Sequence, residues 1–279
     1  DTDPGFGALE LGPGARAQAL GSAYASLADD PSASFWNPAG LARLSPLEVT
    51  ATHHVSFEGI RQEYLSLAKR LSEGTLGISF GAVYNSDPII GTDIRGDSVG
   101  TFGYYETVTT VAFGMRATKN VDAGVGVEYL ADKFGDFTGS GFAVNLGLRY
   151  FPGIPNLSLG ASVRHLGPGI TVDTHSTPLP TTWQGGASYI GSMSQGDLTL
   201  AADLSKTRGD SRVHALFGVE YSRRGFVTLM GGYRTGFDSE AFSFGVGINL
   251  ARFQVQYAVV PYKNDFGTGS RIALTYLGR

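Results

Sequence analysis

The 279-residue sequence has no cysteine, few charged residues and no long apolar run, and each of these absences excludes a class of protein. Without cysteine, neither a disulfide framework nor a thiolate metal site can form. No run of about 18 apolar residues occurs, which excludes a transmembrane helix and leaves a transmembrane β-barrel open. Charged residues make up only 16% of the chain, against about 25% in soluble domains. The charged surface of a cytosolic protein is therefore missing.

The overall balance of charge and apolar residues narrows the class further. The net charge of −4 offers no basic face for a nucleic acid. An apolar share of 42% excludes a disordered chain. The chain begins at Asp1 without methionine, as a secreted precursor does after its signal peptide is cleaved. We therefore expect an exported, folded protein.

From about residue 47 onward, apolar residues alternate with small or polar ones. Phe142, Val144, Leu146, Leu148 and Tyr150, for example, alternate with Ala, Asn, Gly and Arg. A period of two over eight to ten residues indicates a β-strand with one apolar face. Turn signals divide the region into fourteen predicted strands, at 47–57, 62–71, 74–84, 103–117, 120–133, 141–151, 156–166, 181–191, 197–206, 212–222, 226–235, 240–250, 252–262 and 268–278.

The connections and the two faces of the strands favour a membrane barrel over a soluble β-protein. Tight turns follow the even strands, and most connections after odd strands are longer, notably 85–102, 134–140 and 167–180. Short periplasmic turns and longer outer loops are typical of outer-membrane barrels. Aromatic residues gather near strand ends, as in two interfacial girdles. The polar faces carry too few charges to coat fourteen strands in water, so we expect the apolar faces to contact lipid.

The sequence therefore predicts an all-β, membrane-spanning, antiparallel up-and-down β-barrel of fourteen strands at residues 47–279. Its other face would line the lumen. The charged residues expected there are Glu48, Arg70, Glu128, Arg149, Arg164, Asp203 and Glu220.

Residues 1–46 have a different pattern, rich in alanine and without alternation. Asp30 followed by Pro31 is a helix-start pair, with a carboxylate cap and then proline at the first helical position. Asn37 before Pro38 would end that short helix, because a residue before proline is pushed out of the α region. We expect a hatch with short helices packed inside the barrel. The alternative is an arm outside it.

The stretch from Gly14 to Leu41 resembles the N-terminal hatch of the FadL superfamily of outer-membrane β-barrels, and most closely its PorV/PorQ branch. The resemblance is carried by small residues, an acidic pair and a Trp-Asn-Pro-Ala-Gly box. It implies the outer membrane of a Gram-negative-type bacterium. The hatch motif would consist of Asp29, Asp30, Trp36, Asn37, Pro38, Ala39 and Gly40.

The resemblance also implies a function and partners. The first expectation is a PorV-like, non-enzymatic partner in protein export or surface assembly, contacting an exported protein or a component of a type IX-like secretion system. The alternative is a FadL-like conduit for a hydrophobic small ligand, and the third is a structural envelope anchor. We expect a monomeric barrel surrounded by outer-membrane lipid, with no nucleic acid.

No constellation of residues indicates catalysis. His53 and His54 are adjacent in a predicted strand and face opposite ways, which cannot make a metal site. Ser66 and Lys69 likewise point to opposite faces of a strand. We therefore expect neither an enzyme, nor a metal, nor a cofactor.

Overall fold

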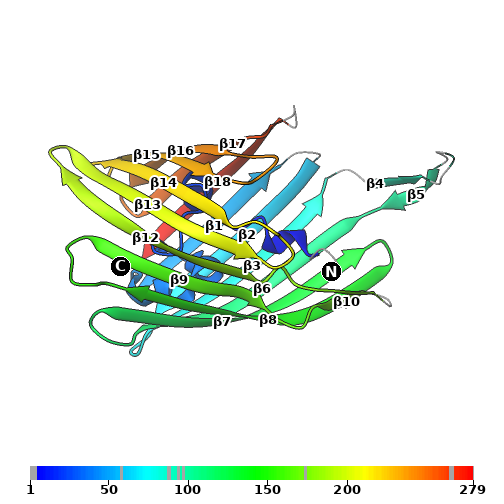
Figure 1. The fold of residues 1–279 in the computed structure, drawn as a ribbon, viewed down its shortest axis with the longest axis horizontal. Coiled ribbons are helices and arrows are strands. Elements are labelled where there is room, and N and C mark those ends of the chain that lie inside the picture. The colour runs from blue at the N-terminus through cyan, green and yellow to red at the C-terminus, as the bar shows by residue number, and fades with distance from the viewer. Residues whose placement is uncertain are drawn as a thin grey trace.

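A computed structural model describes residues 5–56, 59–86, 89–92, 95, 98–172, 175–263 and 267–278. Among them, fourteen antiparallel strands close into a single barrel in the order β1-β18-β17-β16-β15-β14-β13-β12-β9-β8-β7-β6-β3-β2 (Figure 1). The first strand pairs with the last over its whole length, from Leu47 opposite Gly278 to Val55 opposite Ser270. No barrel strand is left with an unpaired edge, which is how barrels avoid edge-to-edge association. The predicted fold class is confirmed.

The strands match the period-two segments closely. Every strand begins and ends within four residues of its predicted bounds. The barrel strands are β1 Leu47–Val55, β2 Ile60–Arg70, β3 Thr75–Asn85, β6 Tyr104–Arg116, β7 Val121–Phe134, β8 Phe137–Tyr150, β9 Leu157–Leu166, β12 Thr182–Met193, β13 Gly196–Thr207, β14 His214–Arg223, β15 Val227–Arg234, β16 Phe242–Leu250, β17 Phe253–Pro261 and β18 Thr268–Gly278.

Three details differ from the sequence prediction, all at the end of the barrel with the longer loops. Two connections contain small hairpins of their own, formed by β4 Ile89–Thr92 with β5 Ser98–Phe102 and by β10 Ile170–Val172 with β11 His175–Thr177. The prediction of a longer loop at 134–140 was wrong. β7 and β8 instead pair as far as Phe134 opposite Phe137 and turn through two residues.

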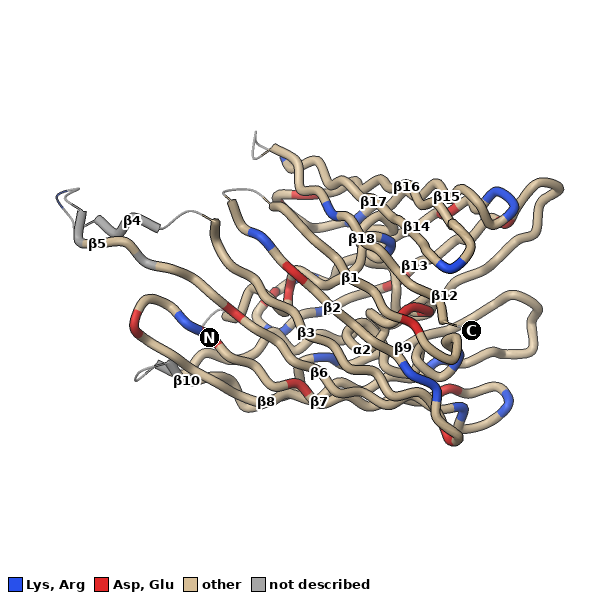
Figure 2. Tube along the Cα trace, turned by 180° about the vertical axis from the view of Figure 1, so that it is seen from behind, with Lys and Arg blue, Asp and Glu red and all other residues tan. Residues whose placement is uncertain are grey.

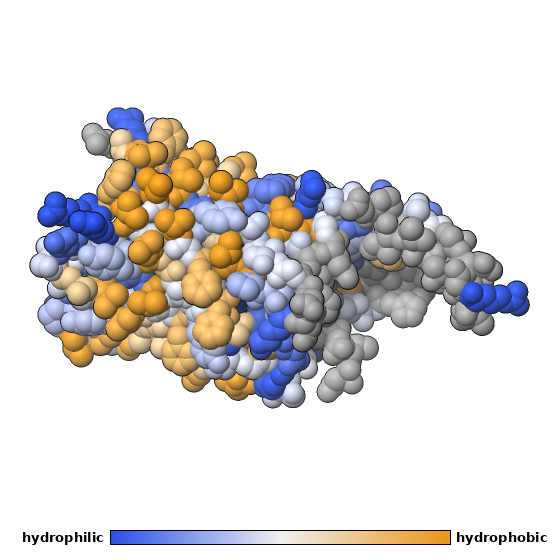
Figure 3. Space-filling view, turned by 90° about the horizontal axis from the view of Figure 1, so that it is seen from above, coloured by the Kyte–Doolittle hydropathy of each residue, from blue (hydrophilic) through white to orange (hydrophobic). Residues whose placement is uncertain are grey.

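The outer surface of the barrel is apolar. Outward-facing side chains such as Val125, Leu146 and Val246 are 45%, 44% and 39% exposed. Figure 3 shows hydrophobic residues spread broadly over the visible face of the strands, and Figure 2 shows that most of the chain along the strands is uncharged. An apolar band around a closed barrel is the surface that a lipid bilayer solvates. The protein is therefore a transmembrane β-barrel of the outer-membrane type.

Residues 5–46, here called the N-terminal segment, run through the interior of the barrel. The segment contains the short helices η1 Gly7–Leu9, α1 Ala15–Ala19, α2 Ala33–Trp36 and η2 Pro38–Arg43. The backbone of Gly5 bonds to Pro178 beside the longer loops, and the carbonyl of Leu44 accepts a bond from Arg70 near the tight turns. The segment thus extends from one end of the lumen to the other. No helix in the described part of the chain is long and apolar enough to cross a membrane.

We predict that arginine at the mid-strand outward position Val246 costs about 2–4 kcal/mol, because the charge would sit in hydrocarbon. The control is Tyr150→Arg at the end of β8, where the cost falls to about 0–1 kcal/mol near the interface. Urea unfolding of both variants in lipid vesicles measures the difference. Equal costs at the two positions would contradict the assigned membrane-facing surface.

Candidate functional site in the barrel lumen

A row of glycines lets the N-terminal segment lie directly on the inner wall. Gly114, Gly124 and Gly147 are cross-strand partners on β6, β7 and β8. A Cβ added at any of these three glycines would overlap the Asn37–Leu41 stretch. At Gly114 and Gly124 it would overlap the backbone of that stretch. The wall must therefore lack side chains where the segment touches it.

A second contact of the same kind lies across the barrel. Gly218 and Gly232 are partners on β14 and β15, and an added Cβ at either would overlap the backbone around Leu20 and Gly21. On the next strand, the Ser243 hydroxyl donates to the carbonyl of Ala19 at 3.0 Å. The segment is therefore held between two opposed patches of small residues.

Charged hydrogen bonds fix the segment between these patches. Arg16 donates from Nε and Nη2 to the two carboxylate oxygens of Glu220, at 2.6 and 3.1 Å, and also pairs with Asp29. Burial disfavours the charged form of Arg16, but the Asp29 and Glu220 carboxylates outweigh it and raise its pKa well above the ordinary value. Tyr24 donates to Asp30 at 2.7 Å. Bidentate arginine–carboxylate pairs are among the stronger polar contacts in proteins.

The Trp-Asn-Pro-Ala-Gly box is buried inside the barrel, against the inner wall. Helix α2 ends at Trp36, and Asn37 is extended with φ −161°, as the following proline requires. The Asn37 side chain is fully buried and donates to the carbonyls of Ala25 and Leu148, at 2.6 and 3.1 Å. The Trp36 ring nitrogen donates to the carbonyl of Pro13 at 2.9 Å. The box thus ties the segment to itself and to strand β8.

The charged residues expected in the lumen differ in what they contact. Most of them contact the N-terminal segment. The Glu48 and Asp203 carboxylates accept hydrogen bonds from the backbone N–H groups of Ser45 and Ala25, respectively, and Glu220 binds Arg16. Arg149 donates to the carbonyl of Ala28, and Arg70 donates to the carbonyl of Leu44. Glu128 instead bonds to Asn145 on β8 and His165 on β9. Arg70 is exposed, since it lies at the end of β2.

Among the described residues, Arg149, Arg164 and Glu128 do not hydrogen-bond to Arg16, Asp29, Asp30 or Asn37, although all three face the lumen. Alternation along a strand says which side a residue faces, but it does not say what lies opposite. Three further contacts were missed: Arg43 with Asp122 at 2.5 Å, Glu106 with the Ala8 backbone at 2.6 Å, and Arg271 with the Leu11 carbonyl at 3.0 Å. Alternation places Asp122 on the polar face, and Arg271 follows the same inward alternation and could have been found from it.

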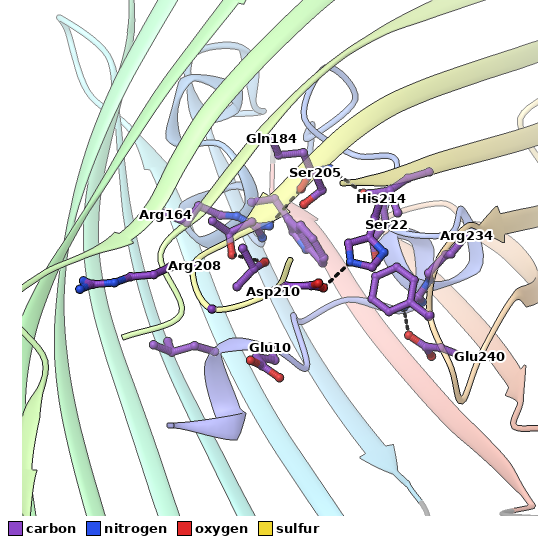
Figure 4. A pocket seen from close by; sticks show the side chains of 17 residues that line it. Glu10, Ser22, Arg164, Gln184, Ser205, Arg208, Asp210, His214, Arg234 and Glu240 are labelled. Carbon is purple, nitrogen blue, oxygen red and sulfur yellow. Dashed lines mark hydrogen bonds and ion pairs between the residues drawn. The ribbon is translucent and has the colours of Figure 1, made fainter. Parts of the chain in front are cut away.

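A cavity of about 360 Å³ lies between the N-terminal segment and strands β9, β12, β13, β14 and β15 (Figure 4). Trp36 and Leu9 of the segment and Leu216 and Phe237 of the wall and loops give it apolar sides. The Arg234–Glu240 ion pair and the hydrogen-bonded His214 and Asp210 lie on its margin. Hydrogen bonds from the Arg212 backbone and from His214 lower the pKa of Asp210. A second, polar cavity of about 320 Å³ near the tight turns contains Arg16, Asp30 and Glu220.

In the described ranges, no three His, Asp or Glu side chains come together in a way that could hold a metal ion. His53 bonds to Glu63, and His54 lies inside the barrel beside Arg271. The two adjacent histidines thus point to opposite faces of β1.

Comparisons with known proteins agree with the fold of the barrel. The model of a family described as "Uncharacterised protein family (UPF0164)" matches residues 3–129. The crystal structure of the Ralstonia pickettii toluene transporter TbuX is similar over 96% of this chain and 99% of its own, with a TM-score of 0.67 and 15% identity. No curated protein matches the sequence.

Two monoaromatic hydrocarbon channels have the same fold. A TodX mutant covers 95% of this chain and 97% of its own, with a TM-score of 0.65 and 14% identity. CymD covers 95% and 96%, with a TM-score of 0.64 and 13% identity. The resemblance to FadL-type barrels is therefore supported at the level of the fold. The closer resemblance to the PorV/PorQ branch is not.

We predict that Gly124→Ala lowers the stability of the protein by about 1–3 kcal/mol, because the methyl group would overlap the backbone at Pro38. Gly126→Ala is the matched control, on the same strand and face, since its added Cβ would meet only wall side chains, the nearest at 3.3 Å. Unfolding in urea and limited proteolysis of residues 5–46 measure both effects. If the two variants behave alike, the segment does not depend on the glycine row.

Proposed function

We propose that this protein is an outer-membrane conduit for small molecules with an apolar part, and that the N-terminal segment is its plug. The cavity between the segment and the wall is the observation that carries the proposal. It offers apolar side chains from both the plug and the barrel, and its volume lies in the range of small-molecule sites. The fold likeness to a toluene transporter and to monoaromatic hydrocarbon channels supports the same role.

The same comparisons favour a conduit over the PorV-like secretion partner and over an envelope anchor. The activities named for the similar barrels are transport and channel activities for small hydrocarbons. The cavity also has the dimensions of a small molecule rather than of a protein surface. A conduit needs no catalytic residues, which accords with a lumen whose charges are used mainly to hold the plug.

The plug accounts for the filling of the lumen. Eight strands already leave an interior that side chains can fill, and the diameter grows with strand number. Fourteen strands with glycine and serine inside need further material, and the N-terminal segment supplies it with Leu20, Tyr24, Trp36 and Leu41, all nearly fully buried. The passage of a molecule then depends on local movement of this segment.

We predict that the intact protein conducts ions poorly in a planar lipid bilayer and that deletion of residues 1–42 leaves a steadily conducting barrel. Residues 1–4 lie outside the described part of the structure, and the deletion removes them with the segment. Different gel migration of boiled and unboiled samples verifies that each barrel is folded. Large open channels in the intact protein, or no change on deletion, would refute the plug.

We predict that a bacterial host expressing the protein in its outer membrane takes up the apolar dye N-phenyl-1-naphthylamine faster than cells without it, and that Leu216→Trp reduces this uptake. Leu216 faces the cavity and is 3% exposed, so the larger ring would fill the space. Leu204→Trp on the lipid side of β13 is the control, with Leu204 60% exposed. Uptake that is unaffected by Leu216→Trp in a folded barrel would argue against this route.

A further inference from the structure

A groove of about 490 Å³ lies on the outer surface of the barrel, across strands β6, β7 and β8, at the end with the longer loops. Its side chains belong mainly to the outward face of these strands. Tyr105 and Tyr129 in the groove are both 45% exposed, whereas Leu130, next to Tyr129, is fully buried. The groove, here called the rim groove, therefore opens toward the membrane and is separate from the lumen cavity.

The strand register orders the polar lining of the rim groove in rows. In the row nearest the longer loops, Lys133 on β7 pairs with Tyr105 on β6 and with Thr138 on β8. Thr107 and Ser140 belong to the next row, two residues further along their strands. A row with a cation is thus followed by a row of hydroxyl groups.

The surface becomes apolar in the direction of the tight turns. Tyr129 pairs with Phe142, and the centroids of the two rings are 5.2 Å apart. In the row beyond, Val111 pairs with Val127, and these side chains are 49% and 50% exposed. Charge, hydroxyl, aromatic and aliphatic groups therefore follow one another, as the surroundings change from headgroup to acyl chain across a leaflet.

Lys133 offers the rim groove an unpaired positive charge. It is exposed and makes no ion pair or hydrogen bond in the described part of the chain. Lys206 and Lys263, at the same end of the barrel, both donate to backbone carbonyls, at 2.6 and 3.2 Å. Among the described lining residues the only acid is Asp132, which lies on the inward face opposite Glu106. The outward charge of the groove is therefore positive.

We propose that the rim groove binds a membrane lipid with a phosphate headgroup. The phosphate lies on Lys133, and the hydroxyls of Thr107 and Ser140 face the esters and hydroxyls that join it to the acyl chains. One chain lies along Tyr129 and the valines beyond it. A lipid is the occupant because it already surrounds the apolar surface onto which the groove opens, and a phosphate complements the unpaired lysine. This inference goes beyond the conduit and does not depend on it.

Native mass spectrometry of the protein in a neutral detergent measures the binding of single lipids. The probes are dioleoyl phosphatidic acid and dioleoylglycerol, which have the same chains and differ by the phosphate. We expect the Kd of the phosphatidic acid to be at least about five-fold lower, the effect of one lysine at a membrane surface. Inorganic phosphate in large excess should not displace it, because the chains contribute to binding.

Lys133→Gln should abolish the preference for the phosphatidic acid. Arg61→Gln is the matched control. Arg61 is an exposed cation without an ion pair among the described residues, and it lies in the same cross-strand row, through Tyr84 and Tyr105, but does not line the groove. It should leave the preference unchanged. Gel migration of unboiled samples verifies that both variants are folded.

A second pair of variants tests the groove itself. Ala131 lies between Thr107 and Ser140 in the register and lines the groove, so Ala131→Trp should fill it and raise the Kd of both lipids. Val127→Trp is the control, on the same face of β7 but outside the groove, and should leave both Kd values unchanged. This pair decides even if Lys133→Gln does not fold.

Each contrary outcome overturns a defined part of the proposal. Equal affinity for the two lipids would exclude recognition of the phosphate. Equal losses in Lys133→Gln and Arg61→Gln would mean general attraction to charge at the rim, without a site in the groove. Equal behaviour of Ala131→Trp and Val127→Trp would likewise exclude the groove, and displacement by inorganic phosphate would exclude a lipid as the specific ligand. Dye uptake tests the conduit separately from all of these.

Discussion

The whole structure depends on the close approach of the N-terminal segment to the inner wall. A fourteen-stranded barrel is too wide for its own side chains to fill, so part of the chain must enter the lumen. That segment can touch the wall only where the strands carry no side chain, as at Gly114, Gly124 and Gly147. The glycine content of the chain is thus a packing requirement of the lumen. It also sets where the segment lies and where a cavity is left over.

Charged and polar contacts are concentrated inside the barrel, where the N-terminal segment meets the wall. On the outer face, lipid offers no partner for charge, and the strands there are apolar. Inside, charges are paired across the contact between segment and wall, as for Arg16 with Glu220 and Arg43 with Asp122. Arg149 and Arg271 are buried as well, and they donate to backbone carbonyls of the segment instead of to carboxylates.

The sequence allowed the barrel to be predicted well, because period-two alternation depends only on which face of a strand meets lipid. Prediction from the sequence failed where the structure of a connection depends on tertiary contacts. The loop expected at 134–140 contains turn-forming residues such as Gly135, Asp136 and Gly139, yet only Gly135 and Asp136 form the turn. The two small hairpins lie outside the barrel sheet and lack its alternation over eight or more residues.

The interior of the site was less predictable for a related reason. Alternation placed Glu128, Arg149 and Arg164 inside the barrel, but their partners depend on the path of a segment far away in sequence. The bulge in β9 adds a further irregularity. His165 has φ +58°, and both it and Arg164 are buried, so two successive residues face inward. A strict period of two cannot anticipate this.

The path of the N-terminal segment limits the order in which the barrel can be assembled. The segment leads directly into β1, and β1 pairs with β18, the last strand of the chain. The seam that closes the cylinder therefore joins the two ends of the strand series and can form only after β18 is made. A segment folded against β6, β7 and β14 before that moment is enclosed as the seam zips shut. A segment that arrived after closure would have to thread lengthwise into the barrel past the tight turns. We therefore expect that enclosure while the barrel closes is faster.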